Sequence, residues 1–207
     1  MLACLDLEGV LLPEIWISFA EKTGIEKLKL TTREVPDYDE LMQGRLKILK
    51  ENNLKLIDIQ NVIKKLSPLE GAVDFLSWLK SEFQVIILSD TFYQFVGPLM
   101  QKLDYPTLFC HKLIVNNNGD ITNYHLRQKD SKTKAVSAFK KLNFTIIAAG
   151  DSYNDIGMLQ EADAGILFSP PENVVKEFPQ YPVSRNYEEF KSILLKTRIN
   201  LEEKNSN

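Results

Sequence analysis

Three short apolar runs in this 207-residue chain are each followed at once by acidic and hydroxyl side chains. The three junctions read LACLDLEG from Leu2, VIILSDT from Val85 and TIIAAGDSYND from Thr145. A four- or five-residue apolar run bounded by turn residues predicts a buried strand, and the stretches between these runs have helical spacing. This alternation predicts an α/β fold with a mostly parallel sheet, so the three polar strand ends should lie along one edge.

The exception to the alternation is the segment 13–69, which carries helical patterns throughout. Pro13 suits the first turn of a helix, and Pro36 marks a loop between two helices. A helical insert at this point in the chain would lie above the end of the first strand and cover Asp6. We therefore expect a core of residues 1–12 and 70–207 with a helical cap of residues 13–69.

Later in the chain, a hairpin is expected between Leu108 and Leu126. The run Asn116-Asn-Asn-Gly119-Asp120 between its two strands is a strong turn signal. The chain is polar over 201–207, and we expect this tail to fray.

The polar strand ends bring several carboxylates toward one place: Asp6, Glu8, Asp90, Asp151 and Asp155. Carboxylates so close together repel one another unless a cation lies among them. Mg²⁺ fits, because it prefers oxygen ligands, keeps waters and shares phosphate oxygens. Capping of the following helices is the simpler explanation for any one cluster, but it explains three successive acidic strand ends poorly.

Phosphate is a ligand that these strand ends could hold. Ser89 offers a hydroxyl, backbone N–H groups after it could meet an anion at a helix N-terminus, and Lys129 or Lys132 could add positive charge. An aspartate nucleophile would split phosphoryl transfer into two steps through an acyl phosphate, and a second carboxylate would move the proton. The residues present therefore fit phosphoryl transfer.

Arg45 occupies an unexpected position in a predicted helix over 39–52. At helical spacing it falls between Leu41 and Leu49, near the middle of the apolar face. Either the arginine reaches around to water, or it faces a wet cleft that holds an anion. The pattern leaves both interpretations open.

Seven strings occur along the chain in this order: ACLDLEGV, PEIWI, LSDTFY, CHKL, RQKD, AAGDSYND and GILF. Together they resemble the haloacid dehalogenase-like phosphatases, in the phosphoserine phosphatase branch, and within it the type that also transfers phosphate to homoserine. The resemblance extends to about residue 195. It implies a Rossmannoid parallel sheet with helices on both faces and a cap after the first strand. It also implies Mg²⁺ as cofactor, O-phosphoserine and homoserine as substrates, and a homodimer.

The resemblance assigns roles to individual residues. The catalytic residues it implies are the nucleophile Asp6 and the general acid and base Glu8. The metal ligands it implies are Asp6, the backbone carbonyl of Glu8 and Asp151, with Asp155 completing the shell. The substrate-binding residues it implies are Glu14 for the ammonium, Arg45 for the carboxylate, Ser89, Asp90, Thr91 and Lys132 around the phosphate, and Asn154 in contact with the substrate. Lys132 is preferred to Lys129 because Val136 and Phe139 follow it at the spacing of the family lysine.

The first motif departs from the usual family pattern. Glu8 and Val10 stand where aspartate and threonine or serine are usual. The homoserine-transferring type shares this glutamate, so the departure favours that subgroup.

Other residues receive ordinary interpretations. His111 and His125 are expected to have structural roles, Trp16 and Trp78 to lie in the core, and Tyr153 either to line the site or to cover it.

The net charge of −3 favours neither nucleic acid nor an anionic membrane as partner. No apolar run is long enough to span a bilayer, and two cysteines are too few for a disulfide framework, so a cytoplasmic setting is expected. Two other functions remain open, a phosphatase of the same fold for another small phosphomonoester and a binding protein without catalysis.

Overall fold

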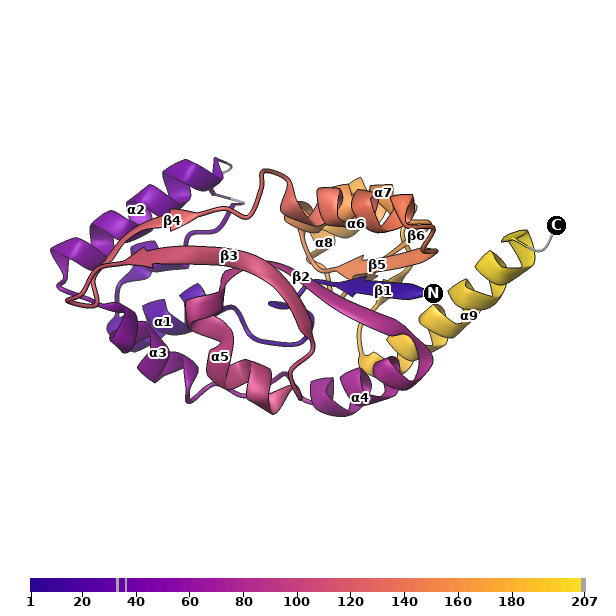
Figure 1. The fold of residues 1–207 in the computed structure, drawn as a ribbon, viewed down its shortest axis with the longest axis horizontal. Helices are drawn as coiled ribbons and strands as arrows, with labels where there is room; N and C mark the ends of the chain where they lie inside the picture. Colours follow the sequence, from indigo (N-terminus) through magenta and orange to yellow (C-terminus); the bar gives the residue numbers. More distant parts are fainter. Residues whose placement is uncertain (33, 36, 206–207) are drawn as a thin grey trace.

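A computed structural model describes residues 1–32, 34–35 and 37–205 (Figure 1). The described residues form a seven-stranded sheet in the order β4-β3-β2-β1-β5-β6-β7. Neighbouring strands are parallel except β3 and β4, which form the expected hairpin. The strands are β1 (Leu2–Leu5), β2 (Gln84–Phe92), β3 (Thr107–Val115), β4 (Ile121–His125), β5 (Ile146–Gly150), β6 (Ala164–Phe168) and β7 (Val183–Ser184).

Helices cover both faces of the sheet, as expected. In Figure 1, α4 (Ala72–Glu82) and α9 (Tyr187–Asn205) lie below it, and α6 (Ser131–Lys141) and α7 (Ile156–Glu161) lie above it. Successive side chains of a strand point to opposite faces. Leu2 and Cys4 of β1 therefore join the apolar cluster of α6, α7 and α8 (Glu172–Glu177), whereas Ala3 and Leu5 join the cluster of α4 and α9.

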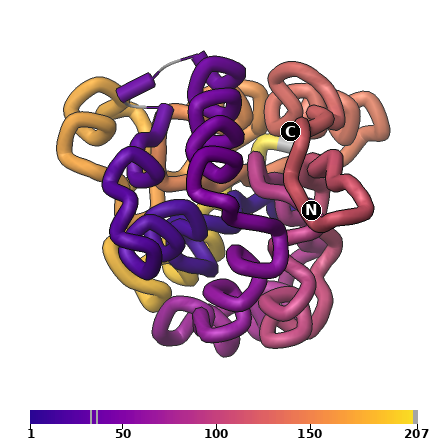
Figure 2. The backbone as a smooth tube through the Cα atoms, turned by 90° about the vertical axis from the view of Figure 1, so that its left-hand side faces the viewer, coloured from indigo at the N-terminus to yellow at the C-terminus, as the bar shows by residue number. Residues whose placement is uncertain are grey.

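Helices joined by turns and loops make up the described part of the segment between β1 and α4. It contains α1 (Ile15–Thr23), a 3₁₀ turn (Glu26–Lys29), α2 (Tyr38–Glu51) and α3 (Leu56–Ile63). These elements gather at one end of the molecule with the β3–β4 hairpin (Figures 1 and 2), where α2 packs along β4 and α3 packs on α5 (Tyr93–Lys102). The hairpin turn is held there by Lys55, whose Nζ donates to the carbonyl of Asn118 at 2.9 Å. Pro36, expected in a loop, lies outside the described residues.

The expectation that the C-terminal tail frays is wrong for residues 201–205. Helix α9 continues to Asn205, while residues 206–207 lie outside the described residues. The helix is anchored by Phe190 and Leu194, which are fully buried, and Leu201 still packs against the core. Glutamate and lysine after Leu201 are good helix formers, so an anchored helix continues through them.

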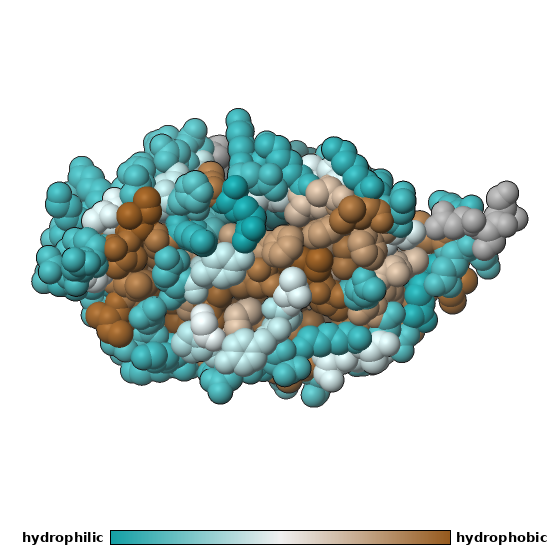
Figure 3. Space-filling view, in the orientation of Figure 1, coloured by the Kyte–Doolittle hydropathy of each residue, from teal (hydrophilic) through white to brown (hydrophobic). Residues whose placement is uncertain are grey.

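The surface in Figure 3 is mainly hydrophilic, with apolar areas over the hairpin end and between α6 and α4. Within the described residues, no helix combines the length and the apolar character needed to cross a membrane.

Candidate active site

The three polar strand ends meet at one edge of the sheet, because β2, β1 and β5 are neighbours. They line a cavity of about 370 Å³ that also reaches α1 and α2. Ten residues assigned a role by resemblance line this cavity: Asp6, Glu8, Glu14, Arg45, Ser89, Asp90, Thr91, Lys132, Asp151 and Asn154. Asp155, expected to complete the metal shell, is fully buried and does not line the cavity. Tyr153, whose placement the sequence left open, lines it as well.

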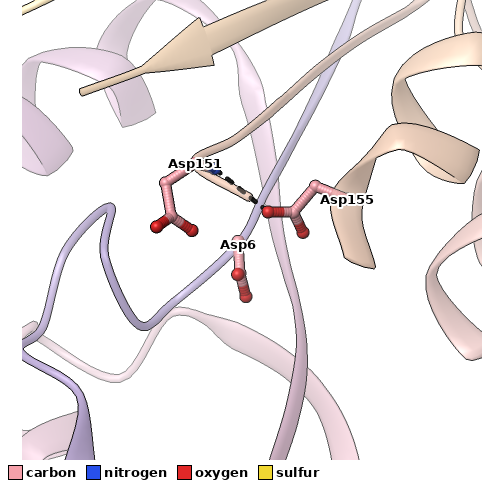
Figure 4. A group of neighbouring side chains, drawn as sticks. All are labelled: Asp6, Asp151 and Asp155. Carbon is pink, nitrogen blue, oxygen red and sulfur yellow. Dashed lines mark hydrogen bonds between the residues drawn. The ribbon is translucent and has the colours of Figure 1, made fainter. Parts of the chain in front are cut away.

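Asp6, Asp151 and Asp155 form a buried acidic cluster at the ends of β1 and β5 (Figure 4). Each contributes a carboxylate oxygen, and these oxygens lie within 4.8 Å of one another. Burial raises the pKa of the Asp6 carboxyl well above its usual range, and the neighbouring charges of Asp155 and Asp151 raise it further. Burial and the charge of Asp155 raise the pKa of Asp151 to about 7. The charged form of this cluster therefore needs a cation.

Lys132, in the first turn of α6, supplies one positive charge. Its Nζ lies 2.9 Å from Asp6 Oδ1, 2.7 Å from Asp155 Oδ1 and 3.7 Å from Asp90 Oδ2. Lys132 is buried, whereas Lys129, the alternative that the sequence left open, is exposed and does not line the cavity. Three clustered carboxylates and one ammonium still leave two negative charges, which a divalent cation would neutralise.

Two glycines leave space for the acidic cluster. Gly9 has φ +80, a conformation that favours glycine, and a Cβ on it would lie 2.5 Å from the Asp151 side chain. A Cβ on Gly150 would lie 2.2 Å from Asp155, which accepts hydrogen bonds from the backbone N–H groups of Asp151 and Ser152. The missing side chains let the carboxylates converge from two strands.

Glu8 follows β1, and its side chain points to the start of α1. Its Oε2 accepts a hydrogen bond of 2.8 Å from the backbone N–H of Ile15, at the positive end of the helix dipole. Burial raises the pKa of the Glu8 carboxyl despite this bond. Burial and the neighbouring charge of Glu8 raise the pKa of Glu14 to about 7. Glu14 can therefore carry a proton near neutral pH, and the raised pKa of Glu8 favours its protonated form.

Arg45 faces the cavity, which agrees with the second of the two interpretations of its position. Its guanidinium carbon lies 4.5 Å from the centre of the Trp16 ring, and Nη2 donates to the carbonyl of Leu30 at 2.8 Å. Burial lowers the pKa of Arg45 to about 10. Its buried Nε has no hydrogen-bond partner among the described residues. A buried cation with an unpaired donor on a cavity wall suits an anionic ligand group.

Ser89–Thr91, expected at the end of a short strand, lie within β2, because the strand continues to Phe92 with a shifted register against β3. The backbone N–H of Thr91 donates to Ser89 Oγ at 3.3 Å, which holds the irregular stretch locally. Burial opposes ionisation of Asp90, but the charge of Lys132 and a hydrogen bond from His111 hold the pKa of that carboxyl well below its usual range.

The sequence did not place two residues of this region at the site. Tyr38 begins α2, lines the cavity and donates from its hydroxyl to the backbone carbonyl of Asp90 at 3.1 Å. His111, assigned a structural role, lies 3.3 Å from Asp90 through Nε2. Both contacts join segments far apart in the chain, so no local pattern marks them. Trp16 is buried as expected, but its ring also forms cavity wall beneath Arg45.

Comparisons with known proteins bear on the family and the fold of this chain. The model of the haloacid dehalogenase-like hydrolase family matches residues 1–163. The chain is 62% identical over 195 residues to the phosphoserine phosphatase of Pseudomonas syringae pv. tomato and to the phosphoserine phosphatase ThrH of Pseudomonas aeruginosa. These alignments cover 94% of this chain, and 82% and 95% of those proteins. A solved structure of a phospho-aspartyl intermediate analogue of phosphoserine phosphatase is similar in fold, with a TM-score of 0.77 at 22% identity, covering 93% of this chain and 97% of that one.

Proposed function

Because this chain belongs to the haloacid dehalogenase-like hydrolase family, we propose that it is a Mg²⁺-dependent phosphoserine phosphatase that works through a phosphate on Asp6. The phosphate then passes to water or to the hydroxyl of homoserine. The observation that carries this proposal is the buried Asp6 carboxylate, 2.9 Å from Lys132, in a cavity that also presents Arg45 and Glu14. The substrate is supported by relatives at 62% identity that are named phosphoserine phosphatases.

Mg²⁺ suits the acidic cluster for two reasons. The oxygens of Asp6, Asp151 and Asp155 converge with a net negative charge, and Gly9 leaves room beside Asp151. We assign Asp6, the backbone carbonyl of Glu8 and Asp151 as ligands, with Asp155 behind them. When bound, the ion neutralises the charge of the transferred phosphate oxygens.

The first step is attack by a carboxylate oxygen of Asp6 on phosphorus. The new oxygen–phosphorus bond forms as the bond to the serine oxygen breaks, and Glu8 donates its proton to that oxygen. Lys132, the hydroxyl of Ser89 and the amide of Asn154 hold the phosphate oxygens during this step. The raised pKa of Glu8 favours the protonated form that it requires.

The second step transfers the phosphate away from Asp6. Glu8, now ionised, removes a proton from water or from the homoserine hydroxyl, whose oxygen attacks phosphorus and breaks the bond to Asp6. Homoserine has the same ammonium and carboxylate as serine, so Glu14 and Arg45 can hold either molecule. The remaining donors of the Arg45 guanidinium, Nε among them, suit a carboxylate.

The stability of the metal-free protein should fall as the pH rises from about 4 to about 7. The pKa of Asp151 is about 7 in the folded protein and 3.8 in the unfolded chain. Between these pH values the folded state keeps a proton on Asp151 that the unfolded chain has released, so each rise in pH lowers the free energy of unfolding. The loss from Asp151 alone is on the order of 4 kcal/mol. Thermal unfolding with EDTA or with Mg²⁺ checks this, and Mg²⁺ should raise the midpoint far more above pH 7 than near pH 5. Equal shifts at both pH values would contradict the assignment.

Replacing Arg45 with alanine should remove the carboxylate site. We expect kcat/KM for phosphoserine to fall about 100-fold, because a charge-assisted hydrogen bond in a buried site is lost. Phosphoethanolamine keeps the ammonium and lacks the carboxylate, so its kcat/KM should change less than about threefold. Steady-state kinetics on both substrates check the prediction. An equal loss on both would mean that Arg45 serves the fold or the phosphate instead.

Phosphorus NMR tests the proposed function as a whole. The protein is supplied with phosphoserine and Mg²⁺, with and without homoserine. Loss of the phosphoserine signal with growth of inorganic phosphate supports the phosphatase activity, and a homoserine phosphate signal supports the transfer. Without homoserine phosphate at millimolar acceptor, the transfer proposal fails. Without phosphoserine turnover, the substrate is another phosphomonoester or the protein is not catalytic.

We also propose that residues 13–69 act as a cap over the cavity, and that the enzyme is a cytoplasmic homodimer. The cap is supported by the contributions of Glu14, Tyr38 and Arg45 to the cavity wall. A reducing compartment suits the free, buried thiols of Cys4 and Cys110. Analytical ultracentrifugation tests the dimer, and sedimentation as a monomer at micromolar concentration would exclude it.

A further inference from the structure

His111 on β3 is a buried histidine that the proposed mechanism does not use. Only 3% of it is exposed, and its ring lies among those of Tyr38 and Phe92. Its Nδ1 accepts a hydrogen bond of 3.1 Å from the backbone N–H of Arg127. Because Nδ1 must then carry a lone pair, the ring proton of neutral His111 is on Nε2. Nε2 is therefore the donor in the 3.3 Å contact with Asp90 Oδ1.

Asp90 uses its two carboxylate oxygens for different partners. Oδ1 accepts from His111 Nε2 and from the hydroxyl of Ser131 at 3.4 Å. Oδ2 accepts from Asn154 Nδ2 at 3.0 Å and lies 3.7 Å from Lys132 Nζ. The hydrogen bonds from His111 and Ser131 therefore restrain the Asp90 carboxylate through Oδ1. Its other oxygen, Oδ2, faces Asn154 and Lys132, which hold the phosphate in the proposed mechanism.

The orientation of Asn154 depends on the same carboxylate. Its Oδ1 accepts from the Ser152 hydroxyl at 2.6 Å while its Nδ2 donates to Asp90. This pattern fixes which end of the amide is the donor, and the second N–H of Nδ2 remains for a ligand. If the Asp90 carboxylate rotated, Asn154 Nδ2 would lose its hydrogen-bond acceptor. The carboxylate could then move closer to Lys132 Nζ than the present 3.7 Å.

We propose that His111 is a positioning residue that acts through Asp90 to hold Asn154 and Lys132 in place for the phosphate group. This inference rests on the proposed function for the identity of the substrate. The contacts of His111 and Asp90 bear only on the binding of the phosphate group. Without the Nε2 donor, attraction draws the Asp90 carboxylate toward Lys132, which then has less of its charge available to the ligand. His111 thereby links the β3–β4 hairpin to the phosphate end of the cavity.

Two variants of His111 separate this role from packing. In His111→Gln, the side-chain Nε2 can take the place of the ring Nε2 and still donate to Asp90. In His111→Asn, the shorter side chain can accept from Arg127 but cannot reach Asp90. His125→Asn is the matched control, because His125 is exposed on the same hairpin. The measurements are kcat and KM for phosphoserine, the inhibition constant of inorganic phosphate, and the thermal unfolding midpoint.

We expect His111→Asn to raise KM and the inhibition constant of phosphate about tenfold. His111→Gln should stay within about threefold of the wild type, and His125→Asn should not differ from it. In an Asp90→Asn background, His111→Asn should have little further effect, because the two residues act as one unit. Three results would each overturn the proposal. The first is that all three histidine variants have the same KM and inhibition constant, and the second is that activity falls only in proportion to the folded fraction. The third is that His111→Asn weakens phosphate binding as much in the Asp90→Asn background as in the wild type.

Calorimetric titration of the same variants with inorganic phosphate in the presence of Mg²⁺ keeps the two proposals distinguishable. If wild-type protein does not turn over phosphoserine, the proposed function fails. The inference on His111 then still stands or falls on whether His111→Asn weakens phosphate binding about tenfold while His111→Gln does not.

Discussion

Replacing Asp6 with asparagine should lower kcat for phosphoserine by on the order of 10⁵-fold, in the range found when an enzyme loses its nucleophile. The amide is close in size to the carboxylate but cannot form the acyl phosphate. Hydrolysis and transfer to homoserine should be lost together, because both pass through the same phosphate on Asp6. Phosphorus NMR at high enzyme concentration measures both products. Appreciable turnover in Asp6→Asn, or loss of only one product, would contradict the assignment.

The folded state of Asp6→Asn should survive. Lys132 keeps its 2.7 Å bond to Asp155, and the substitution removes one of three clustered negative charges. Since the pKa of Asp6 is raised by burial and by its acidic neighbours, ionised Asp6 carries a cost that asparagine does not. In EDTA, the unfolding midpoint should therefore match or exceed that of the wild type. A strongly lowered midpoint would assign the activity loss to unfolding.

Replacing Lys132 with methionine should reduce both stability and activity. The buried ammonium contacts Asp6 and Asp155, so methionine leaves these carboxylates without their cation, at a cost of about 3–5 kcal/mol. The turnover of the remaining folded enzyme should fall at least about 100-fold, because the phosphate loses a positioned charge. Chemical unfolding and steady-state kinetics measure the two effects.

Lys129→Met is the matched control for Lys132→Met. Lys129 stands three residues earlier and is exposed. Its loss should change stability by less than about 0.5 kcal/mol and leave kinetics near the wild type. The destabilisation of Lys132→Met should also shrink toward pH 5, because protonation of the clustered carboxylates removes their repulsion. If Lys129→Met were the more damaging change, the phosphate lysine would be assigned incorrectly.

The parts of this molecule that were predictable from sequence are those with a local pattern. Apolar runs of four or five residues predicted β1, β2 and β5, and the parallel sheet placed their polar ends at one cavity. Arg45 was conspicuous because it interrupts an apolar helical face, and the structure turns that position toward the cavity. In both cases the periodicity of a single element carried enough information.

The parts that were not predicted depend on contacts between distant segments. His111 and Tyr38 reach Asp90 across 21 and 52 positions of the chain. His111 belongs to the string CHKL, but nothing in that string indicates a contact with Asp90. The end of β2 was also missed, and the C-terminal tail was expected to fray. Pairing with β3 extends β2 beyond its apolar run, and burial of Phe190 anchors α9. Such extensions arise from tertiary packing, which overrides local preference.

Glu8 shows how a departure from a familiar motif acquires a structural explanation. Compared with aspartate, the side chain is one methylene longer. Its carboxylate reaches the backbone N–H of Ile15 at the start of α1 and lies close to Glu14. The group that we propose as the proton carrier is thus held by the start of α1 as well as by the backbone that follows β1. This placement makes its geometry dependent on the position of the residues that we propose as the cap.

The central claim is that phosphate from phosphoserine becomes covalently attached to Asp6. Its most direct test is a rapid acid quench of the wild-type enzyme during turnover of ³²P-labelled phosphoserine with Mg²⁺, followed by peptide mapping. The account predicts transient, acid-stable label on the peptide that contains Asp6, its faster loss when homoserine is added, and no label on Asp6→Asn. Turnover of phosphoserine with no protein-bound label at any quench time, or label on another residue, would contradict it.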